Sequence, residues 1–476
     1  MTITSFSQNK YKFRRQWVIL RKNSDFYYKN WNNVVLSKDF VLYYHPDLNV
    51  RMINISEPKV KRIIILGILL VPHLDTLLES TNFIKKSLDI GNEIDDFCEF
   101  LSGSYVIVLC ESESISIFTD PAALRGVYYS SYSVASTPLL ISKNVERDKD
   151  LDSCFPFGSS DEWYPGDLTP YKNIRALMAN HKLNLTTGVI ERFWPKKSTQ
   201  NISYSDALEK VSKILRNTLE YASKEWDLIV SLTGGKDTRV NLSASRNIKN
   251  SLHYFTIADK DLKNCDYVLS KRLADTFNLN HKVYPILRPE KWLLKLYDQN
   301  SSFMSIGKRR EIVSTCNLLS GHNTVHVNGN LGAICKSFYW HRKKPKNVKI
   351  ESLLKEFYNR PVKIKYAVNR WFQSLPDVSP ITAYNLMYLE QRSRWMSPGE
   401  TGSQLFYESL SPFNNRLILE IVSSINVNEF LKNDFLVSLV DFMWPELLDV
   451  SYCKNGRNWT KKIPKRLRER LKKNFR

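Results

Sequence analysis

The sequence has no long hydrophobic run. Its longest apolar stretch, residues 63–72, holds about ten residues, whereas a membrane-spanning helix needs roughly 20. We therefore expect a buried strand at this position and no transmembrane segment. Residues 1–22 are polar and basic and lack the apolar stretch of a signal peptide.

Cysteine is sparse, and its spacing shows no pattern. The seven cysteines are odd in number and never form a CxxC pair; they stand at positions 98, 110, 154, 265, 316, 335 and 453. This argues against a disulfide framework and against a zinc site, and it favours a cytoplasmic protein with reduced thiols. The eight histidines show no HxH or HExxH spacing, so we do not expect them to bind metal.

Acidic residues are in deficit. The 476 residues include 69 Lys and Arg against 48 Asp and Glu, a net charge of +21, and residues 453–476 alone carry +10. Within this basic segment Ile463, Leu467, Leu471 and Phe475 repeat every four residues, which predicts a helix with one apolar stripe. Three interpretations stay open: the helix docks on the rest of the chain, attracts an anionic partner such as tRNA, or lies on an acidic membrane surface.

Two patterns of secondary structure divide the chain. Hydrophobic content of 43% and charged content of 25% indicate a globular protein, and the length indicates more than one domain. The first part predicts antiparallel strands, with helices over 75–88 and 92–101; the clearest strands are 17–20, 40–44, 63–70, 105–109 and 115–118. After Pro195 a helix (203–224), a strand (227–232), a strand (252–257) and a helix (265–277) predict a parallel sheet; a strand at 325–327 follows in a mostly helical remainder.

The motif that carries chemistry is SLTGGKDTR, residues 231–239, directly after an apolar strand and opening a helix. Paired glycines allow a tight turn that brings backbone N–H groups close to an anion, and the helix N-terminus adds its dipole. The side chains of Ser231, Thr233 and Thr238 add hydroxyl donors, while Asp237 is placed to meet Mg²⁺ carried by a phosphate. The motif is neither a Walker A loop nor GxGxxG.

Residues 233–238 (TGGKDT) resemble the SGGxDS loop of the PP-loop ATP pyrophosphatases, and more specifically that of class B asparagine synthetase and its relatives, the β-lactam synthetases and lasso-peptide cyclases. Further segments resemble this family in the same order along the chain: FLSGSYVIV (100–108), TDPAALRGVYY (119–129), YKNIRAL (171–177), RFWP (192–195), NGNLGA (328–333) and ESLSPFNN (408–415).

The resemblance implies an α/β protein of two domains. Residues 1–195 would form a glutaminase-like, Ntn-hydrolase-like α+β sandwich, and residues 196–476 a PP-loop (adenine nucleotide α-hydrolase-like) parallel-sheet synthetase domain with a helical C-terminal part. The implied reaction is ATP-dependent amide formation, in which a substrate carboxylate is adenylated, pyrophosphate is released and an amine displaces AMP. ATP and Mg²⁺ are the implied cofactors, and a small-molecule or peptide carboxylate and an amine donor are the implied partners; a homodimer is an open option.

The resemblance also implies roles for particular residues. Glu408 and Tyr388 (or Tyr384) match the proton-handling pair of the lactam-forming relatives, Lys454 matches their C-terminal lysine, and Asp237 matches the metal ligand. The implied ATP-binding residues are Ser231, Leu232, Thr233, Gly234, Gly235, Asp237, Thr238, Phe255, Thr256 and Gly329. A buried ion pair for Glu408 and a solvated cation for Lys454 are the alternatives.

Two departures from the family pattern keep other functions open. The glutaminases of the family need an N-terminal cysteine, but this chain begins Met1-Thr2 and its first cysteine is Cys98, so we expect an inactive first domain that does not use glutamine. The family's second motif ends in an acidic pair, but here Ala333 and Ile334 stand at those positions. The alternatives are therefore a catalytically degenerate partner or scaffold protein and, less favoured, a PP-loop enzyme that modifies RNA.

Overall fold

The computed structural model describes residues 8–26, 28–55, 61–74, 76–90, 92–112, 114–131, 133–152, 163–196, 201–259, 264–305, 308–336, 338–339, 362–454 and 457–459. Thr2, Cys154 and the basic helix expected within 463–476 lie outside these residues. In the described part, no helix combines the length and the apolar character needed to cross a membrane.

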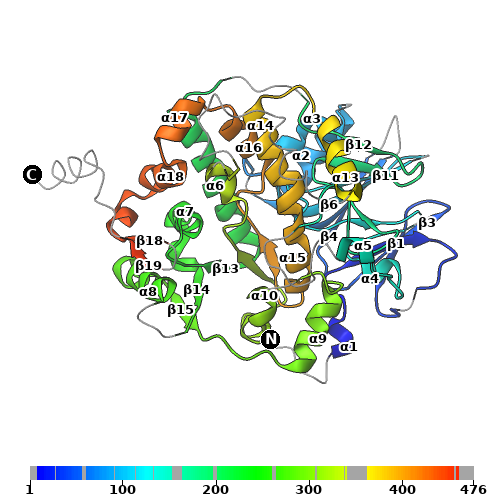
Figure 1. The fold of residues 1–476 in the computed structure, drawn as a ribbon, viewed down its shortest axis with the longest axis horizontal. Helices are drawn as coiled ribbons and strands as arrows, with labels where there is room; N and C mark the ends of the chain where they lie inside the picture. The colour runs from blue at the N-terminus through cyan, green and yellow to red at the C-terminus, as the bar shows by residue number, and fades with distance from the viewer. Residues whose placement is uncertain are drawn as a thin grey trace, which may run out of the picture.

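Two six-stranded antiparallel sheets build the first part of the chain (Figure 1). The order of one is β10-β8-β9-β1-β3-β2, and that of the other is β12-β11-β7-β6-β5-β4. The strands of the first are β1 (Trp17–Arg21), β2 (Asn32–Val35), β3 (Phe40–Tyr44), β8 (Tyr128–Tyr129), β9 (Val134–Ala135) and β10 (Arg175–Ala176). Those of the second are β4 (Val50–Ile55), β5 (Lys61–Leu70), β6 (Ser102–Cys110), β7 (Ile115–Thr119), β11 (His181–Asn184) and β12 (Ile190–Arg192).

These two sheets face each other. Trp17, Ile19 and Leu42 of the first sheet share a buried cluster with Ile64 and Val106 of the second. Strands rich in β-branched and aromatic residues pack well in such a sandwich. The strands expected at 17–20, 40–44, 63–70, 105–109 and 115–118 are thus confirmed as β1, β3, β5, β6 and β7.

Short helices accompany the sandwich: α1 (Gln8–Tyr11), α2 (Leu77–Asp89), α3 (Ile94–Phe97), the 3₁₀ turn Cys98–Phe100, α4 (Pro138–Ile141) and α5 (Lys149–Asp152). The helix α2 begins with a capping box, in which Thr76 accepts a hydrogen bond from the N–H of Glu79 and the Glu79 side chain accepts one from the N–H of Thr76. The helices expected at 75–88 and 92–101 are confirmed with slightly shifted ends.

The second part is built on a five-stranded parallel sheet with the order β15-β14-β13-β16-β17. Its strands are β13 (Asp227–Ser231), β14 (His253–Ile257), β15 (His281–Tyr284), β16 (Thr324–Val327) and β17 (Glu408–Leu410). The predicted parallel sheet is confirmed, as are its strands at 227–232, 252–257 and 325–327. The chain is therefore an α/β protein with antiparallel sheets followed by a parallel sheet.

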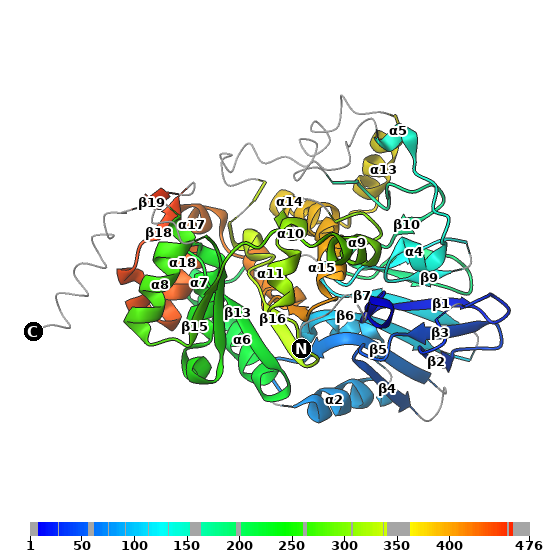
Figure 2. The same cartoon turned by 90° about the horizontal axis from the view of Figure 1, so that it is seen from below.

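Helices cover both faces of this sheet (Figure 2). Leu228 and Val230 face one cluster, shared with α6 and α8, whereas Ile229 faces another, shared with α9 and α11. This alternation reflects the two-residue period of a strand buried on both sides. Before and around the sheet lie α6 (Tyr204–Glu225), α7 (Lys236–Ala244), the 3₁₀ turn Arg246–Ser251, α8 (Cys265–Phe277), α9 (Lys291–Asn300), α10 (Lys308–Glu311) and α11 (Val313–Asn317).

The helical remainder follows β16. It comprises the 3₁₀ turn Gly332–Lys336, α13 (Val362–Gln373), α14 (Pro380–Leu386), the π turn Met387–Arg392, the 3₁₀ turn Ser393–Met396, α15 (Ser397–Ser403), α16 (Arg416–Ser423), α17 (Val427–Lys432), α18 (Phe435–Met443) and the 3₁₀ turn Pro445–Asp449. A small antiparallel ribbon, β18 (Tyr452–Lys454) and β19 (Arg457–Trp459), comes last.

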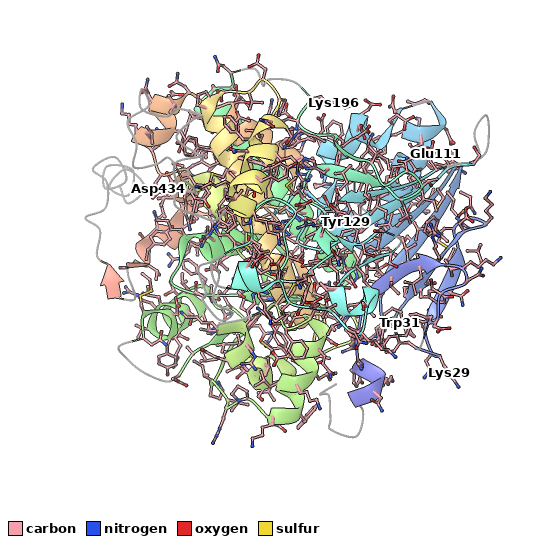
Figure 3. The ribbon with its side chains drawn as sticks, turned by 45° about the vertical axis from the view of Figure 1, so that its right-hand side comes forward. Lys29, Trp31, Glu111, Tyr129, Lys196 and Asp434 are labelled. Atoms are coloured by element: carbon pink, nitrogen blue, oxygen red, sulfur yellow. A yellow bond between two sulfur atoms is a disulfide. The ribbon has the colours of Figure 1, made fainter. Side chains whose placement is uncertain are left out.

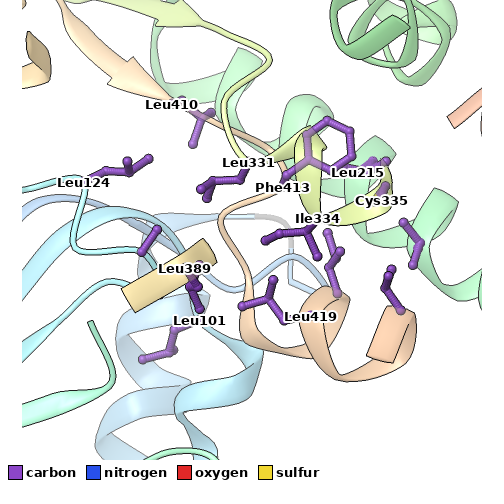
Figure 4. Close-up of a cluster of buried hydrophobic side chains, with 14 of the residues drawn as sticks. Leu101, Leu124, Leu215, Leu331, Ile334, Cys335, Leu389, Leu410, Phe413 and Leu419 are labelled. Atoms are coloured by element: carbon purple, nitrogen blue, oxygen red, sulfur yellow. The ribbon is translucent and has the colours of Figure 1, made fainter. Parts of the chain in front are cut away.

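One hydrophobic cluster joins the two parts of the chain. Leu101 and Leu124 of the first part lie in the same buried cluster as Leu215, Leu331 and Leu410 of the second (Figure 4). The division expected at residue 195 falls between β12 and α6 and remains a prediction, because the core is continuous across it.

Candidate functional site

The glycine turn connects the central strand β13 to α7. Gly235 is the N-cap residue of α7, and its N–H donates to Thr233 Oγ1 at 3.1 Å. Thr233 Oγ1 and Thr238 Oγ1 lie 2.9 Å apart, within hydrogen-bond distance. The turn therefore closes around two threonine hydroxyl groups at the N-terminus of a helix, where backbone dipoles favour an anion.

The turn lies at the point of the parallel sheet where the order of strand addition reverses. The chain proceeds from β13 outward through β14 to β15, and then returns to add β16 and β17 on the other side of β13. In open α/β sheets, ligands bind outside the carboxyl ends of the strands at this switch point. The loops that follow β13 and β16 are the glycine turn and residues 328–332, both singled out in the sequence.

The backbone beside the turn is fixed by the neighbouring strand. The N–H of Leu232 donates to the carbonyl of Phe255 at 2.8 Å, and Thr256 Oγ1 donates to the carbonyl of Leu232 at 2.6 Å. Leu232 is fully buried, so only its backbone could meet a ligand. The predicted ATP-binding residues Phe255 and Thr256 thus lie directly beside the turn.

Gly234 is covered by the C-terminal ribbon. Its N–H donates to Asp266 Oδ1 at 2.9 Å, and its carbonyl accepts from the N–H of Cys453 at 2.8 Å. A Cβ atom at Gly234 would lie 2.4 Å from Cys453 Sγ, so no other residue fits without movement. The glycine is needed here for close approach rather than for a positive φ angle.

Cys453 forms a disulfide with Cys265, the first residue of α8, across 188 positions. The expectation of reduced thiols is therefore wrong for these two cysteines. Sequence spacing could not reveal the pair, because only the fold brings β18 against α8. Cys98, Cys110, Cys316 and Cys335 are free and buried.

Asp237, in the first turn of α7, is enclosed by the loop after β16. A Cβ atom at Gly329 would lie 2.7 Å from Asp237 Cβ, and one at Gly332 would lie 2.2 Å from Asp237 Oδ1. Asn241 Nδ2 donates to the carbonyl of Asn328 at 2.8 Å and holds this loop in place. The predicted ATP-binding residue Gly329 and the predicted metal ligand Asp237 are thus in contact.

The carboxylate of Asp237 already has a cationic partner. Its Oδ2 atom forms an ion pair with Lys336 Nζ, while its Oδ1 atom is buried and has no hydrogen-bond partner. The side chains of Ala333 and Ile334, which precede Lys336, offer no ligand atoms. Among the residues described, no group of three or more His, Cys, Asp or Glu side chains could hold a metal ion. Because Oδ2 is paired and Oδ1 is enclosed, Asp237 is arranged for an ammonium group, and a Mg²⁺ ion here would have to rely on phosphate and water ligands.

A second cation of the turn is also paired. Lys236 forms an ion pair with Asp434, the N-cap residue of α18, whose position is labelled in Figure 3. Both side chains remain about one third exposed. Arg239, in contrast, is fully buried and donates to the carbonyls of Leu447, Val450 and Ser451, which anchors the segment before β18 to α7.

The predicted catalytic residue Glu408 is the first residue of β17 and is buried. Its Oε2 atom forms an ion pair with Arg125, which comes from the first part of the chain and is also buried. This is the buried ion pair that the sequence analysis left as the alternative for Glu408. Its catalytic role remains a prediction.

The other two predicted catalytic residues are placed differently. Tyr388 is buried in the π turn Met387–Arg392, where burial raises its pKa to about 12 and the charge of Asp237 acts in the same direction. The tyrosine therefore lies within electrostatic reach of the glycine turn. Tyr384, the alternative, is buried in α14. The backbone of Lys454 lies in β18, but its side chain is outside the described part of the structure.

A histidine that was not among the predicted site residues lies at the switch point. His326 of β16 has its Nε2 atom 2.6 Å from Oγ of Ser231, the last residue of β13. Burial lowers the pKa of His326 to about 4, so the ring is neutral at pH 7. A lone histidine between two valines in a short strand carries no sequence signal of this kind.

A buried acid beside the second loop was likewise not among the predicted site residues. Glu400 accepts a hydrogen bond from Asn330 Nδ2 at 2.7 Å and forms an ion pair with Arg309 at 2.5 Å. Burial alone would raise the pKa of Glu400, but the Arg309 charge and the hydrogen bonds outweigh it and hold the pKa below its usual range. The Arg309 side chain remains 36% exposed, so this cation is accessible from solvent.

In the first part of the chain, the side chains that precede β1 stabilise the fold through hydrogen bonds to distant backbone carbonyls. Arg15 is fully buried and donates to the carbonyls of Gln404 and Gly321 at 2.7 and 2.6 Å, and Arg14 donates to that of Leu405 at 3.0 Å. None of these side chains is a nucleophile. Whether the first domain lacks glutaminase activity stays a prediction, because residues 1–7, the end at which the family's glutaminases carry their cysteine, are outside the described residues.

Comparisons with known proteins leave the family open. No protein-family model and no curated protein matches the sequence. Among solved structures, the chain is similar to a glutamine phosphoribosylpyrophosphate amidotransferase from B. subtilis complexed with ADP and GMP (9% identity, TM-score 0.22, covering 70% of this chain and 73% of that chain). It is also similar to an allosteric regulatory enzyme of purine biosynthesis (10%, 0.23, 68% and 70%). Both TM-scores are too low to support an argument about fold or function.

Proposed function

We propose that the chain is an ATP-dependent ligase that forms an amide bond through an acyl-adenylate. The observation that carries the proposal is the meeting of two glycine loops at the switch point of the parallel sheet, with Asp237 enclosed between them. The first loop opens a helix and presents hydroxyl groups, as a phosphate site requires.

In the proposed reaction, an oxygen of the substrate carboxylate attacks the α-phosphorus of ATP. The bond from that phosphorus to the bridging oxygen breaks, and pyrophosphate leaves. The amine then attacks the acyl carbon, AMP departs with the carboxylate oxygen, and the nitrogen loses a proton. The developing negative charge on the pyrophosphate is the feature that the site must stabilise.

Each group of the site has a part in this scheme. The glycine turn and the N-terminus of α7 would bind phosphate oxygens, and Lys236 would lie near the departing pyrophosphate. Phe255, in the middle of β14 and opposite Ser231, would flank the adenine. Arg309, the partly exposed cation beside Asn330, would attract the substrate carboxylate. No step here depends on a metal held by the protein, because the donor set around Asp237 does not favour one.

The test is an ATP–pyrophosphate exchange assay over a panel of carboxylic acids, with amines supplied in a second series. We expect exchange with one class of acid, and loss of exchange in Arg309→Met with little change in ATP binding. The matched control is Arg310→Met, since Arg310 is paired with Asp298 away from Asn330. ATP binding without exchange for any acid would contradict the ligase proposal.

A second candidate is a nucleotide-binding partner protein without catalysis. Two observations favour it: Gly234 is covered by Cys453, and Asp237 is paired with Lys336. Binding of ATP without formation of AMP, in every combination of acid and amine, is the result that it predicts. Within the described residues, no observation favours the RNA-modifying alternative.

A further inference from the structure

The contact between Asp237 and Lys336 bears on how the site handles phosphate charge. Lys336 is the last residue of the 3₁₀ turn Gly332–Lys336, which follows the second glycine loop, and Asp237 lies in the first turn of α7. The two residues are 99 positions apart, yet the loop after β16 brings them into an ion pair. The pair therefore lies at the same switch point as the glycine turn.

Asp237 keeps one carboxylate oxygen, Oδ1, without a hydrogen-bond partner, and that oxygen is enclosed. Gly332 lies against Oδ1, since a Cβ atom added to that glycine would be 2.2 Å away, and Oδ1 is buried. The other oxygen, Oδ2, is held by the ammonium group. A protein-bound Mg²⁺ ion needs carboxylate oxygens free to enter an octahedral shell about 2.1 Å from the metal.

Lys336, in contrast, has N–H donors that the ion pair does not use. An ammonium group carries three N–H donors, of which the ion pair with Asp237 uses one. The side chain is 39% exposed, so the remaining donors are accessible from solvent. The ion pair holds the ammonium group at the first turn of α7 without removing its capacity to donate to phosphate oxygens.

The neighbouring charged residues also favour a phosphate site built on protein cations. Lys236 adds a second ammonium group at the start of α7, and Asp434 is its partner. Asp266, the other acid at the turn, accepts from the Gly234 N–H. Each described carboxylate that contacts the turn or its lysines is therefore engaged by a protein donor, whereas both lysines keep exposed surface.

We propose that Lys336 is the resident cation of this site, and that it neutralises phosphate charge at the position where a protein-held magnesium ion was expected. The inference rests on the proposed function, because it assumes that the glycine turn binds the phosphates of a nucleotide. Its specific consequence is that nucleotide binding does not depend on a divalent metal held by Asp237.

The experiment measures ATP binding by calorimetry in EDTA and in excess Mg²⁺, for the wild type and for Lys336→Met, Lys336→Arg and Lys213→Met. Lys213 is an exposed lysine of α6 and serves as the matched control. We expect wild-type affinities in EDTA and in Mg²⁺ to agree within about threefold. In EDTA, Lys336→Met should lose about tenfold in affinity or more, Lys336→Arg should recover most of it, and Lys213→Met should match the wild type. Thermal melting confirms that each variant is folded.

Two results would overturn the inference, and they differ in what they say about the proposed function. If the wild type binds ATP only with Mg²⁺ and Lys336→Met binds as well or better, then the metal displaces Lys336 and the nucleotide site itself stands. If the folded wild type binds neither ATP nor pyrophosphate under either condition, then the proposed function fails and the inference fails with it.

Discussion

Cys265 and Cys453 are joined by a disulfide, which attaches the ribbon β18–β19 to α8 beside the glycine turn. Their Cα atoms lie 5.9 Å apart, and the backbone N–H of Cys453 donates to the carbonyl of Gly234. The covalent bond thus connects β18 to α8, and the hydrogen bond connects it to the glycine turn. The phosphate site that we propose is therefore bordered by a segment whose attachment depends on redox state.

Loss of this disulfide should lower stability. In the chain-entropy model, a cross-link that closes a loop of 188 residues contributes up to about 5 kcal/mol. We expect reduction with dithiothreitol to lower the free energy of unfolding of the wild type, measured by urea titration followed by fluorescence. Cys453→Ser should be destabilised to a similar degree and should not respond to dithiothreitol. An equal response of the variant and the wild type would contradict the assignment.

The two glycines of the turn should differ in their tolerance of a side chain. In Gly234→Ala, the new Cβ would overlap Cys453 Sγ and Leu269 Cδ1, at 2.4 and 2.9 Å. We expect a loss of about 1–3 kcal/mol in unfolding free energy from this overpacking. In Gly235→Ala, the nearest atom is Thr233 Oγ1 at 3.2 Å, so the loss should stay below about 1 kcal/mol. Chemical denaturation of both variants checks the contrast; equal losses would mean that β18 does not rest on Gly234.

Glu408 offers a test between a structural and a catalytic role. Glu408→Leu leaves Arg125 buried without its ion-pair partner, which should cost about 3–5 kcal/mol in unfolding free energy. The double variant Glu408→Leu with Arg125→Met removes both charges and should recover much of that loss. Chemical denaturation of the wild type and of both variants measures these losses. A stable single variant that binds ATP but forms no AMP would instead support the catalytic role implied by the family resemblance.

Two partly buried histidines should make stability depend on pH. Burial lowers the pKa of His281 and that of His326 to about 4, from an ordinary value of 6.5. Because the unfolded chain takes up these protons more readily than the folded one, their contribution is complete above pH 6.5 and is lost as the pH falls toward 4.

Urea titrations at pH 7 and pH 5 check this dependence. The double variant His281→Asn with His326→Asn should lose less stability between the two pH values than the wild type does. His322→Gln is the control, since the His322 side chain is exposed and should leave the dependence unchanged. If the double variant shows the full wild-type fall in stability, other groups are responsible for it.

The sheet around the site was predictable from sequence, but the contacts inside the site were not. Runs such as 227–232 are apolar and bounded by a glycine pair, so both β13 and the turn after it follow from local pattern. Phe255 and Thr256 could be placed beside the turn because adjacent parallel strands end at the same edge of a sheet.

The partners of the charged residues depend on the fold as a whole. Lys336 meets Asp237 across 99 positions, and Arg125 meets Glu408 across 283. Nothing in the local sequence distinguishes these side chains from solvated charges, because pairing over such separations is decided by how the loops pack. The same holds for Cys265 and Cys453, whose spacing is typical of free thiols.

The arginines before β1 have a consequence for how this chain can be divided. The Arg15 guanidinium donates to backbone carbonyls more than 300 positions later, and burial lowers its pKa to about 10. A fragment starting after residue 195 would lose these donors and expose one side of the shared hydrophobic cluster. The molecule should therefore melt in one cooperative transition, and attempts to express either half alone should yield aggregation-prone protein.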